Sequence, residues 1–345
     1  AQWGANRIGA RRLAALARRH GSAEVCRASG RLRDHGERRL RAALAEASER
    51  VGGRRLRFED HLEAADGELV PVRVEVTLTP DRVVADFGGT GAARRGVPSA
   101  VEAVTRACLE FALRCCVGGD VPRNGGASRL LHLVAPIGSV VAAAPPVPVG
   151  AGNVEASQRI ADVLLGALAP AFPDRVGAAS QGTMNNVLVG SDAGAATEPF
   201  VYYETVAGGQ GGRPGAPGQN GIHTGMTNTA NTPVESIETA FPLRVVRYGL
   251  RRGSGGAGAH PGGEGIVRDL LVLVDATVSL VTERRQVLPW GLAGGGPGAV
   301  GENWLLRGGD EARAERLPAK CTIHLEAGDV LRMLTPGGGG WGPAG

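Results

Sequence analysis

The sequence has little of what several classes of protein require. Its 345 residues include five cysteines, only 4% aromatic residues and a single lysine, Lys320. The odd number of cysteines, without a disulfide-type spacing, indicates reduced thiols and predicts a cytoplasmic protein. No apolar run reaches the ~18 residues of a membrane-spanning helix, so we expect no membrane partner. The formal net charge is +4, but the cations form no dense stripe with aromatic residues, which argues against nucleic-acid binding.

Motifs for several common chemistries are also absent. The chain contains no P-loop, no H-E-x-x-H, no C-x-x-C and no G-x-S-x-G sequence, so it predicts no nucleotide-binding loop of its own. A formal G-x-G-x-x-G occurs at 296–301, but "ENWLL" follows it and is typical of a strand, whereas a dinucleotide site needs a helix there. The histidines lack metal-ligand spacing, so we expect no metal site; zinc held by His223 with Glu204 or Glu235 is the alternative.

Glycine, by contrast, is abundant. The 55 glycines are roughly twice the usual share of about 7%. They cluster in short runs between apolar segments, a pattern that predicts tight turns and close approaches of backbone to backbone. We interpret the closing "TPGGGGWG" as the end of a strand followed by a flexible glycine run.

Hydrophobic periodicity predicts an α+β fold. Residues 3–20 and 24–49 have the spacing of amphipathic helices, and the second helix is expected to break near Gly36. Residues 72–78 alternate between apolar and polar side chains, as a half-buried strand does. Residues 268–283 are interpreted as a hairpin or two adjoining strands.

Changes in composition along the chain suggest three parts. We expect a helical N-terminal segment at 1–53 and an α+β domain at 54–180. Residues 181–345 form the third part, a β-rich domain with glycine loops. The fold class is therefore α+β, with N-terminal helices followed by mixed sheets and a glycine-rich, β-rich C-terminal half.

The stretch "TNTANTPVES" at 227–236 is the first candidate site. The part at 232–235 fits a capping box, with Thr232 as N-cap and Glu235 reaching back to its amide. That interpretation leaves Asn228 and Asn231 unexplained. Their amides offer two donors and an acceptor each, which suits a pocket for a cyclic amide or carbonyl compound; pinning of a tight loop is the alternative.

An acidic residue precedes a second group of glycines. Glu204 follows the strand-like "FVYYE" and comes before "TVAGGQGG". Glycines there would let backbone approach a ligand closely, so Glu204 could act as a general base or orient a water molecule. A turn residue without catalytic role is the alternative.

Taken together, these motifs resemble those of a known family. The segments that carry the resemblance, in chain order, are "AQWGANRIGARRL", "DFGGTG", "VPRNGG", "GNVEASQRIADVLLGALA", "ASQGTMNN", "FVYYETVAGGQGG", "TNTANTPVESIETAFPLRVVRYGLR", "GGEGIVRD", "ERRQVLPWGLAGG" and "TPGGGGWG". The chain resembles the hydantoinase B/oxoprolinase family. That family comprises the B-type subunits of ATP-dependent hydantoinases, the corresponding half of 5-oxoprolinase, and α subunits of acetone-type carboxylases.

The resemblance implies a cytoplasmic hetero-oligomer. ATP would be bound by a separate hydantoinase-A-type subunit rather than by this chain, and that subunit would phosphorylate the substrate. The B-type chain would complete ring opening of a hydantoin or 5-oxoproline, or carbon–carbon bond formation in a carboxylase. Family members begin with a segment whose His and Asp residues resemble a divalent metal site, and this sequence starts downstream of it. The segment Gln219-Asn220-Gly221 stands where the family often has Asp-Gly, and Gly253 stands where an Asp is common.

We therefore expect a portion of a subunit that opens cyclic amides with the help of ATP. In this hypothesis the catalytic residues are Glu204, Asn228 and Asn231. The expected substrate-binding residues are Glu235, Arg284, Arg285 and His223, with an arginine neutralising phosphate. A carboxylase α subunit and a non-catalytic assembly fragment are the alternatives.

Overall fold

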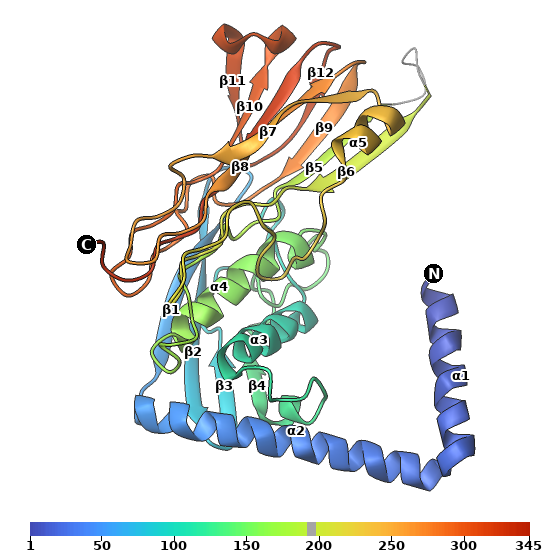
Figure 1. The fold of residues 1–345 in the computed structure, drawn as a ribbon, viewed down its shortest axis with the longest axis vertical. Helices are drawn as coiled ribbons and strands as arrows, with labels where there is room; N and C mark the ends of the chain where they lie inside the picture. Colours follow the sequence, from blue (N-terminus) through green and yellow to red (C-terminus); the bar gives the residue numbers. More distant parts are fainter. Residues whose placement is uncertain (192–197) are drawn as a thin grey trace.

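The computed structural model describes residues 1–191 and 198–345. Within these residues, five α-helices and 13 strands in three sheets confirm the predicted α+β class. Figure 1 shows two helices that form an L-shaped arm, a lower layer of helices on a sheet, and an upper pair of sheets. No helix in the described part of the chain has both the length and the apolar character that a bilayer crossing requires.

The arm consists of α1 (Gln2–His20) and α2 (Ser22–Val51). Every residue of α1 is at least partly exposed, whereas α2 buries the apolar side of its C-terminal half. The predicted break near Gly36 is wrong, because α2 continues through it. A Cβ atom at Gly36 would lie 2.5 Å from the Asn124 side chain, so this glycine allows close packing rather than ending the helix.

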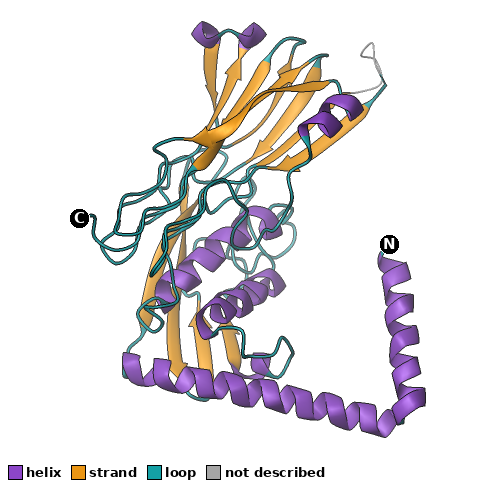
Figure 2. Ribbon diagram, viewed as in Figure 1, coloured by secondary structure: helices purple, strands orange, loops and turns teal. Residues whose placement is uncertain are grey.

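The lower layer is a four-stranded sheet covered by two helices (Figure 2). The apolar positions of the predicted alternating strand at 72–78 are buried, as expected. The strands pair in the order of the chain, antiparallel except for the last pair. They are β1 (Leu56–Glu63), β2 (Leu69–Thr79), β3 (Arg82–Asp86) and β4 (Leu131–Val134). The covering helices are α3 (Glu102–Val117) and α4 (Ser157–Leu168), the latter preceded by a π-helical turn at Gly152–Ala156.

Two sheets form the upper part and share a hydrophobic core. One has the order β12-β9-β5-β6 and the other β11-β10-β13-β8-β7. The strands of the first are β5 (Asn186–Ser191), β6 (Phe200–Thr205), β9 (Ala276–Val281) and β12 (Lys320–Leu325). The strands of the second are β7 (Leu243–Arg251), β8 (Gly265–Val272), β10 (Glu302–Leu306), β11 (Ala314–Leu317) and β13 (Val330–Leu334). Of the two interpretations of 268–283, the hairpin is wrong, since β8 and β9 belong to different sheets, whereas two adjoining strands are present.

Extended glycine-rich segments run side by side between the upper sheets and the lower layer (teal in Figure 2). We call these segments, 207–219, 253–264, 291–301 and 336–342, the glycine bundle. The Gly339 amide donates to Ala179 O at 2.8 Å, and the Gly338 amide to Gly263 O at 2.9 Å. All four glycines of "GGGG" are buried. The prediction of a flexible tail is therefore wrong: backbone packs directly on backbone there.

The apolar core is divided into two clusters. One joins the C-terminal half of α2 to the lower layer and ends at Val176. The other begins at Val187 and fills the space between the upper sheets. The expected division of the chain at residues 53 and 180 stays a prediction.

Candidate functional site

A cavity lies where the loop before α5 (Val234–Ala240) faces the end of β6. Its volume is about 360 Å³. The lining residues are Asn153, Val154, Met184, Tyr203, Glu204, Thr205, Met226, Thr227, Asn228, Thr229, Ala230 and Thr232. Two of the three predicted catalytic residues, Glu204 and Asn228, thus share one cavity, although they are distant in the sequence. We call it the β6 cavity.

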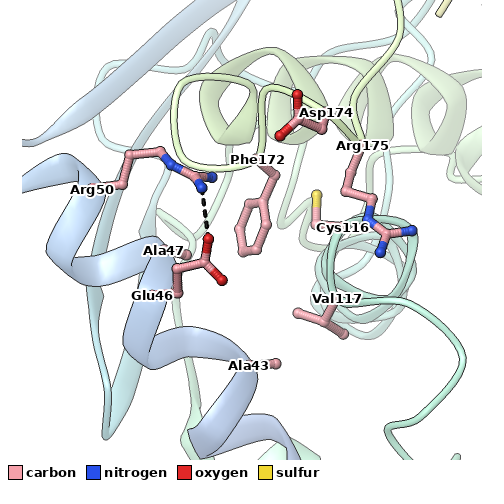
Figure 3. Close-up of a pocket in the computed structure, with 9 residues that line it drawn as sticks. All are labelled: Ala43, Glu46, Ala47, Arg50, Cys116, Val117, Phe172, Asp174 and Arg175. Atoms are coloured by element: carbon pink, nitrogen blue, oxygen red, sulfur yellow. Dashed lines mark hydrogen bonds and ion pairs between the residues drawn. The ribbon is translucent and has the colours of Figure 1, made fainter. Parts of the chain in front are cut away.

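Other cavities do not gather the predicted residues in this way. Figure 3 shows one of about 430 Å³ between α2, α3 and the loop after α4. Phe172 lies at its centre, and Arg50 donates to Glu46 at 2.8 Å on its rim. A third cavity, of about 580 Å³, includes Arg285 and the β1–β2 turn. The β6 cavity is therefore our candidate site.

The carboxylate of Glu204 pairs with an arginine of the facing sheet. Arg268 Nη2 on β8 lies 3.0 Å from Glu204 Oε2, and both side chains are almost fully buried. Burial raises the pKa of Glu204 above its ordinary value, while the Arg268 charge and the Tyr202 hydroxyl oppose that rise. The contact lacks the alignment of a hydrogen bond, and both Glu204 oxygens are without a hydrogen-bond partner among the described residues. Glu204 is thus a buried, charge-paired acid at the wall of the cavity.

Asn231 and His223 belong to a polar cluster behind Glu204 and do not line the cavity. The Asn231 amide donates to the Tyr248 hydroxyl. The Arg268 guanidinium lies 4.9 Å from the centre of the Tyr248 ring, the geometry of a cation–π contact. Burial lowers the pKa of His223, and the neighbouring Asn231 side chain opposes that shift. Asn231 is therefore connected to Glu204 through Tyr248 and Arg268, but Asn231 itself does not line the cavity.

Glu235 lies elsewhere, and the capping box is wrong. The helix α5 begins at Val234 with Pro233 as its N-cap residue, so Thr232 stands one position too early to cap it. Thr232 lines the β6 cavity instead. Glu235 is exposed on the first turn of this seven-residue helix. The structure does not bring it to the candidate site.

Arg284 and Arg285 are also separated from the cavity. Arg284 is fully buried, and its Nη2 lies 2.9 Å from Asp60 Oδ2 and 2.7 Å from Asp162 Oδ2. Arg285 donates to the side-chain oxygens of Asn185 and Asn303, and burial lowers its pKa to about 10. The Arg284 charge thus pairs with acids of the lower layer, whereas the Arg285 guanidinium lies among amide oxygens of the upper part. Neither arginine lines the β6 cavity, and the neutralisation of phosphate by one of them stays a prediction.

Sequence reasoning missed a second polar group at the cavity. The Tyr203 hydroxyl donates to Asn186 Oδ1 at 2.6 Å, and Asn186 Nδ2 donates to Glu155 Oε1 at 2.7 Å. Glu155 is fully buried on the π-helical turn, and burial, followed by the charge of Glu283, raises its pKa to about 8. The available signal was an acidic residue within an apolar helical pattern, "GNVEASQRIADVLL".

The described residues do not fit a metal ion. Among residues 1–191 and 198–345, no three His, Cys, Asp or Glu side chains are placed to hold one. The zinc alternative with His223 and Glu204 or Glu235 gains no support, because Glu204 faces Arg268 and Glu235 lies on the surface. The site is therefore built from a carboxylate, amides, hydroxyls and a phenol.

Curated relatives cover the chain almost end to end. An uncharacterized protein of Methanocaldococcus jannaschii is 39% identical over 97% of this chain and 57% of its own length. A 5-oxoprolinase of Saccharomyces cerevisiae is 34% identical over 99% of this chain and 27% of its own. The B component of a putative D-/L-hydantoinase from a Pseudomonas species is 30% identical over 99% and 59%. The chain thus spans between about a quarter and three fifths of the length of these relatives.

Solved structures share the fold. An ATP-dependent caprolactamase from Pseudomonas jessenii matches with a TM-score of 0.86 at 23% identity, covering 99% of this chain and 60% of that one. Acetone carboxylase matches with a TM-score of 0.77 at 15% identity, covering 89% and 47%. The hydantoinase B/oxoprolinase family model matches residues 1–344. The resemblance seen in the sequence is confirmed, and the chain belongs to the hydantoinase B/oxoprolinase family.

Proposed function

We propose that the chain supplies the substrate cavity of an ATP-dependent hydrolase that opens cyclic amides. The observation that carries this proposal is the β6 cavity, where Tyr203 and Glu204 of β6 meet Asn228 of the loop before α5. A cyclic amide presents a carbonyl acceptor and an N–H donor, which the Asn228 amide and the Tyr203 hydroxyl complement. The names of the relatives, a 5-oxoprolinase and a hydantoinase component, support the same substrate class.

The chemistry explains why ATP would be needed. Resonance makes an amide carbonyl a poor electrophile. Transfer of the terminal phosphoryl group of ATP to the amide oxygen activates the carbon, and water then adds to it. The ring C–N bond breaks, the nitrogen takes a proton, and a second water releases phosphate from the resulting acyl phosphate. Asn228 would hold the ring. Glu204, which is paired with Arg268 in the cavity wall, would orient the attacking water molecule.

A second polypeptide completes the proposal. The chain has no P-loop, and we assign ATP to a hydantoinase-A-type partner in a cytoplasmic hetero-oligomer. The Pseudomonas relative is named as one subunit of a hydantoinase, which supports such a partnership. A divalent metal that takes part in the reaction would be bound by residues other than the described ones, which group no three metal-binding side chains.

The test is turnover by the full chain combined with a hydantoinase-A-type partner. ATP-dependent ring opening of 5-oxoproline, hydantoin and caprolactam would be measured for wild type, Asn228→Ala and the matched control Asn6→Ala. Asn6 lies on the exposed helix α1. We expect Asn228→Ala to lower turnover at least tenfold, the order expected for a lost positioning hydrogen bond, and Asn6→Ala to leave it unchanged. Bicarbonate-dependent consumption of ketones, without ring opening, would instead support the carboxylase alternative.

A further inference from the structure

A chain of hydrogen bonds connects the buried acid Glu155 to the wall of the β6 cavity. Glu155 Oε1 accepts from the Met184 amide at 3.1 Å and from Asn186 Nδ2 at 2.7 Å. Asn186 Nδ2 also donates to Val281 O at 2.9 Å. Tyr203 ends the chain: its hydroxyl donates to Asn186 Oδ1, and Tyr203 is one of the residues that line the cavity.

The orientation of the Asn186 amide is fixed by its partners. A side-chain amide has two N–H donors and one oxygen, and the two ends are told apart by what surrounds them. Val281 O is a backbone carbonyl, which only accepts. Nδ2 must therefore face Val281 and Glu155, and Oδ1 must face Tyr203. This holds whether or not Glu155 carries a proton on its other oxygen, because Oε1 accepts in both states.

The fixed amide determines what Tyr203 offers to a ligand. A phenol has one hydrogen to donate, and Tyr203 gives that hydrogen to Asn186 Oδ1 at 2.6 Å. Burial raises the pKa of Tyr203, so the phenol keeps its proton near neutral pH. What remains for the cavity is a lone pair on the hydroxyl oxygen. Although tyrosine commonly serves as donor or acceptor, toward a ligand in the cavity this tyrosine can only accept.

We infer that Tyr203 is a specificity-determining residue that accepts a hydrogen bond from the ring N–H of the substrate. The inference rests on the proposed function, in which the β6 cavity takes a cyclic amide. Tyr203 then selects lactams over ring esters of the same size, because an ester oxygen has no hydrogen to donate and would face the phenol oxygen with a lone pair. Glu155 and Asn186 are positioning residues, since they act on the ligand through Tyr203.

The test compares two ligands that differ only at this position. Binding of 5-oxoproline and of its lactone analogue, in which oxygen replaces the ring N–H, is measured by ligand-observed NMR titration of the full chain. Wild type should bind the lactam about tenfold more tightly, the low end of what a lost hydrogen bond to a polar group costs. In Tyr203→Phe the preference should fall to about threefold or less, because the phenol oxygen is gone.

Val201→Ala is the matched control. Val201 lies two residues earlier on β6 and is exposed like Tyr203, so its replacement should leave the lactam preference intact. Tyr203→Phe removes only an oxygen from a half-exposed side chain and should fold. A full preference in Tyr203→Phe, or equal binding of both ligands by wild type, overturns the inference but leaves the proposed function standing. Binding of neither ligand by wild type overturns both.

Discussion

Arg268 of β8 and Glu204 of β6 form a buried ion pair that joins the two upper sheets beside the β6 cavity. The residues around the pair form the apolar interface between the two upper sheets. Its charges therefore neutralise each other where little water reaches them, and Tyr248 covers the guanidinium from the side of the cluster. The cavity wall and the sheet packing thus depend on the same two side chains.

Breaking this pair should be costly. In Arg268→Met the Glu204 carboxylate stays buried without its counter-charge, so we expect a loss of about 3–5 kcal/mol in the free energy of unfolding. The double variant Arg268→Met with Glu204→Gln should regain part of the lost free energy of unfolding. Urea unfolding followed by circular dichroism measures both. Arg27→Met, which breaks the exposed pair with Glu24 on α2, is the control and should change little. Equal effects at the two sites would contradict the role given to the Glu204 pair.

The glycine bundle should not tolerate even one methyl group. A Cβ at Gly338 would lie 2.0 Å from Gln210 O, so Gly338→Ala must push two backbones apart. We expect a loss of at least about 1–3 kcal/mol. At Gly249, on β7, an added Cβ would meet nothing within 4 Å among the described residues. Thermal unfolding of Gly338→Ala and Gly249→Ala should therefore differ clearly, and similar melting curves would refute direct backbone packing.

Glu63 anchors the loop after β9 to β1. One or both of its carboxylate oxygens accept from the backbone amides of Arg285, Gln286 and Val287 at 2.8–3.1 Å. In Glu63→Ala these amides lose their acceptor, so they should exchange hydrogen faster than in wild type. Glu63→Gln keeps one oxygen and should be intermediate. Hydrogen exchange read by mass spectrometry tests this. Unchanged protection at 285–287 in a folded Glu63→Ala protein would show that another contact holds the loop.

Glu155 should make stability depend on pH in a direction opposite to most carboxylates. Its pKa is raised from 4.5 to about 8, so between these values the folded chain keeps a proton that the unfolded chain releases. Stability from this group is therefore complete below pH 4.5 and declines as pH rises to about 8, by up to about 1.4 kcal/mol per unit.

Glu155→Gln, which cannot ionise, isolates this contribution from other titrating groups. The variant should gain stability relative to wild type between pH 5 and pH 8, measured as the difference in urea unfolding at each pH. A constant difference over that range would mean that Glu155 titrates at an ordinary carboxylate pKa.

The fold class and the main helices follow from periodicity, because burial on one face leaves a direct trace in the sequence. Two features left no such trace. A run of glycines has the same sequence whether it is mobile or packed against backbone, so "GGGG" did not distinguish the two states. Strands β8 and β9 both bury apolar side chains, and their patterns do not say which sheet each one joins.

The candidate site was predictable in part for the same reason. Glu204 and Asn228 were singled out because polar residues among glycines are conspicuous. The structure places both at one cavity, and their catalytic role stays a prediction. Arg284 and Arg285 do not line this cavity, and the sequence does not show that acids from β1 and α4 pair with Arg284. Tyr203 escaped notice because its role depends on Asn186 and Glu155, which only the fold brings beside it.

The glycine bundle has a consequence at the level of the gene. Every base change in the first two positions of a glycine codon replaces glycine with a larger residue or a stop. At Gly209, Gly211 and Gly338 a Cβ would lie about 2 Å from a carbonyl oxygen. Any such substitution at these positions should therefore destabilise the fold. Heritable variation should therefore be removed from these codons first, while the third base drifts freely.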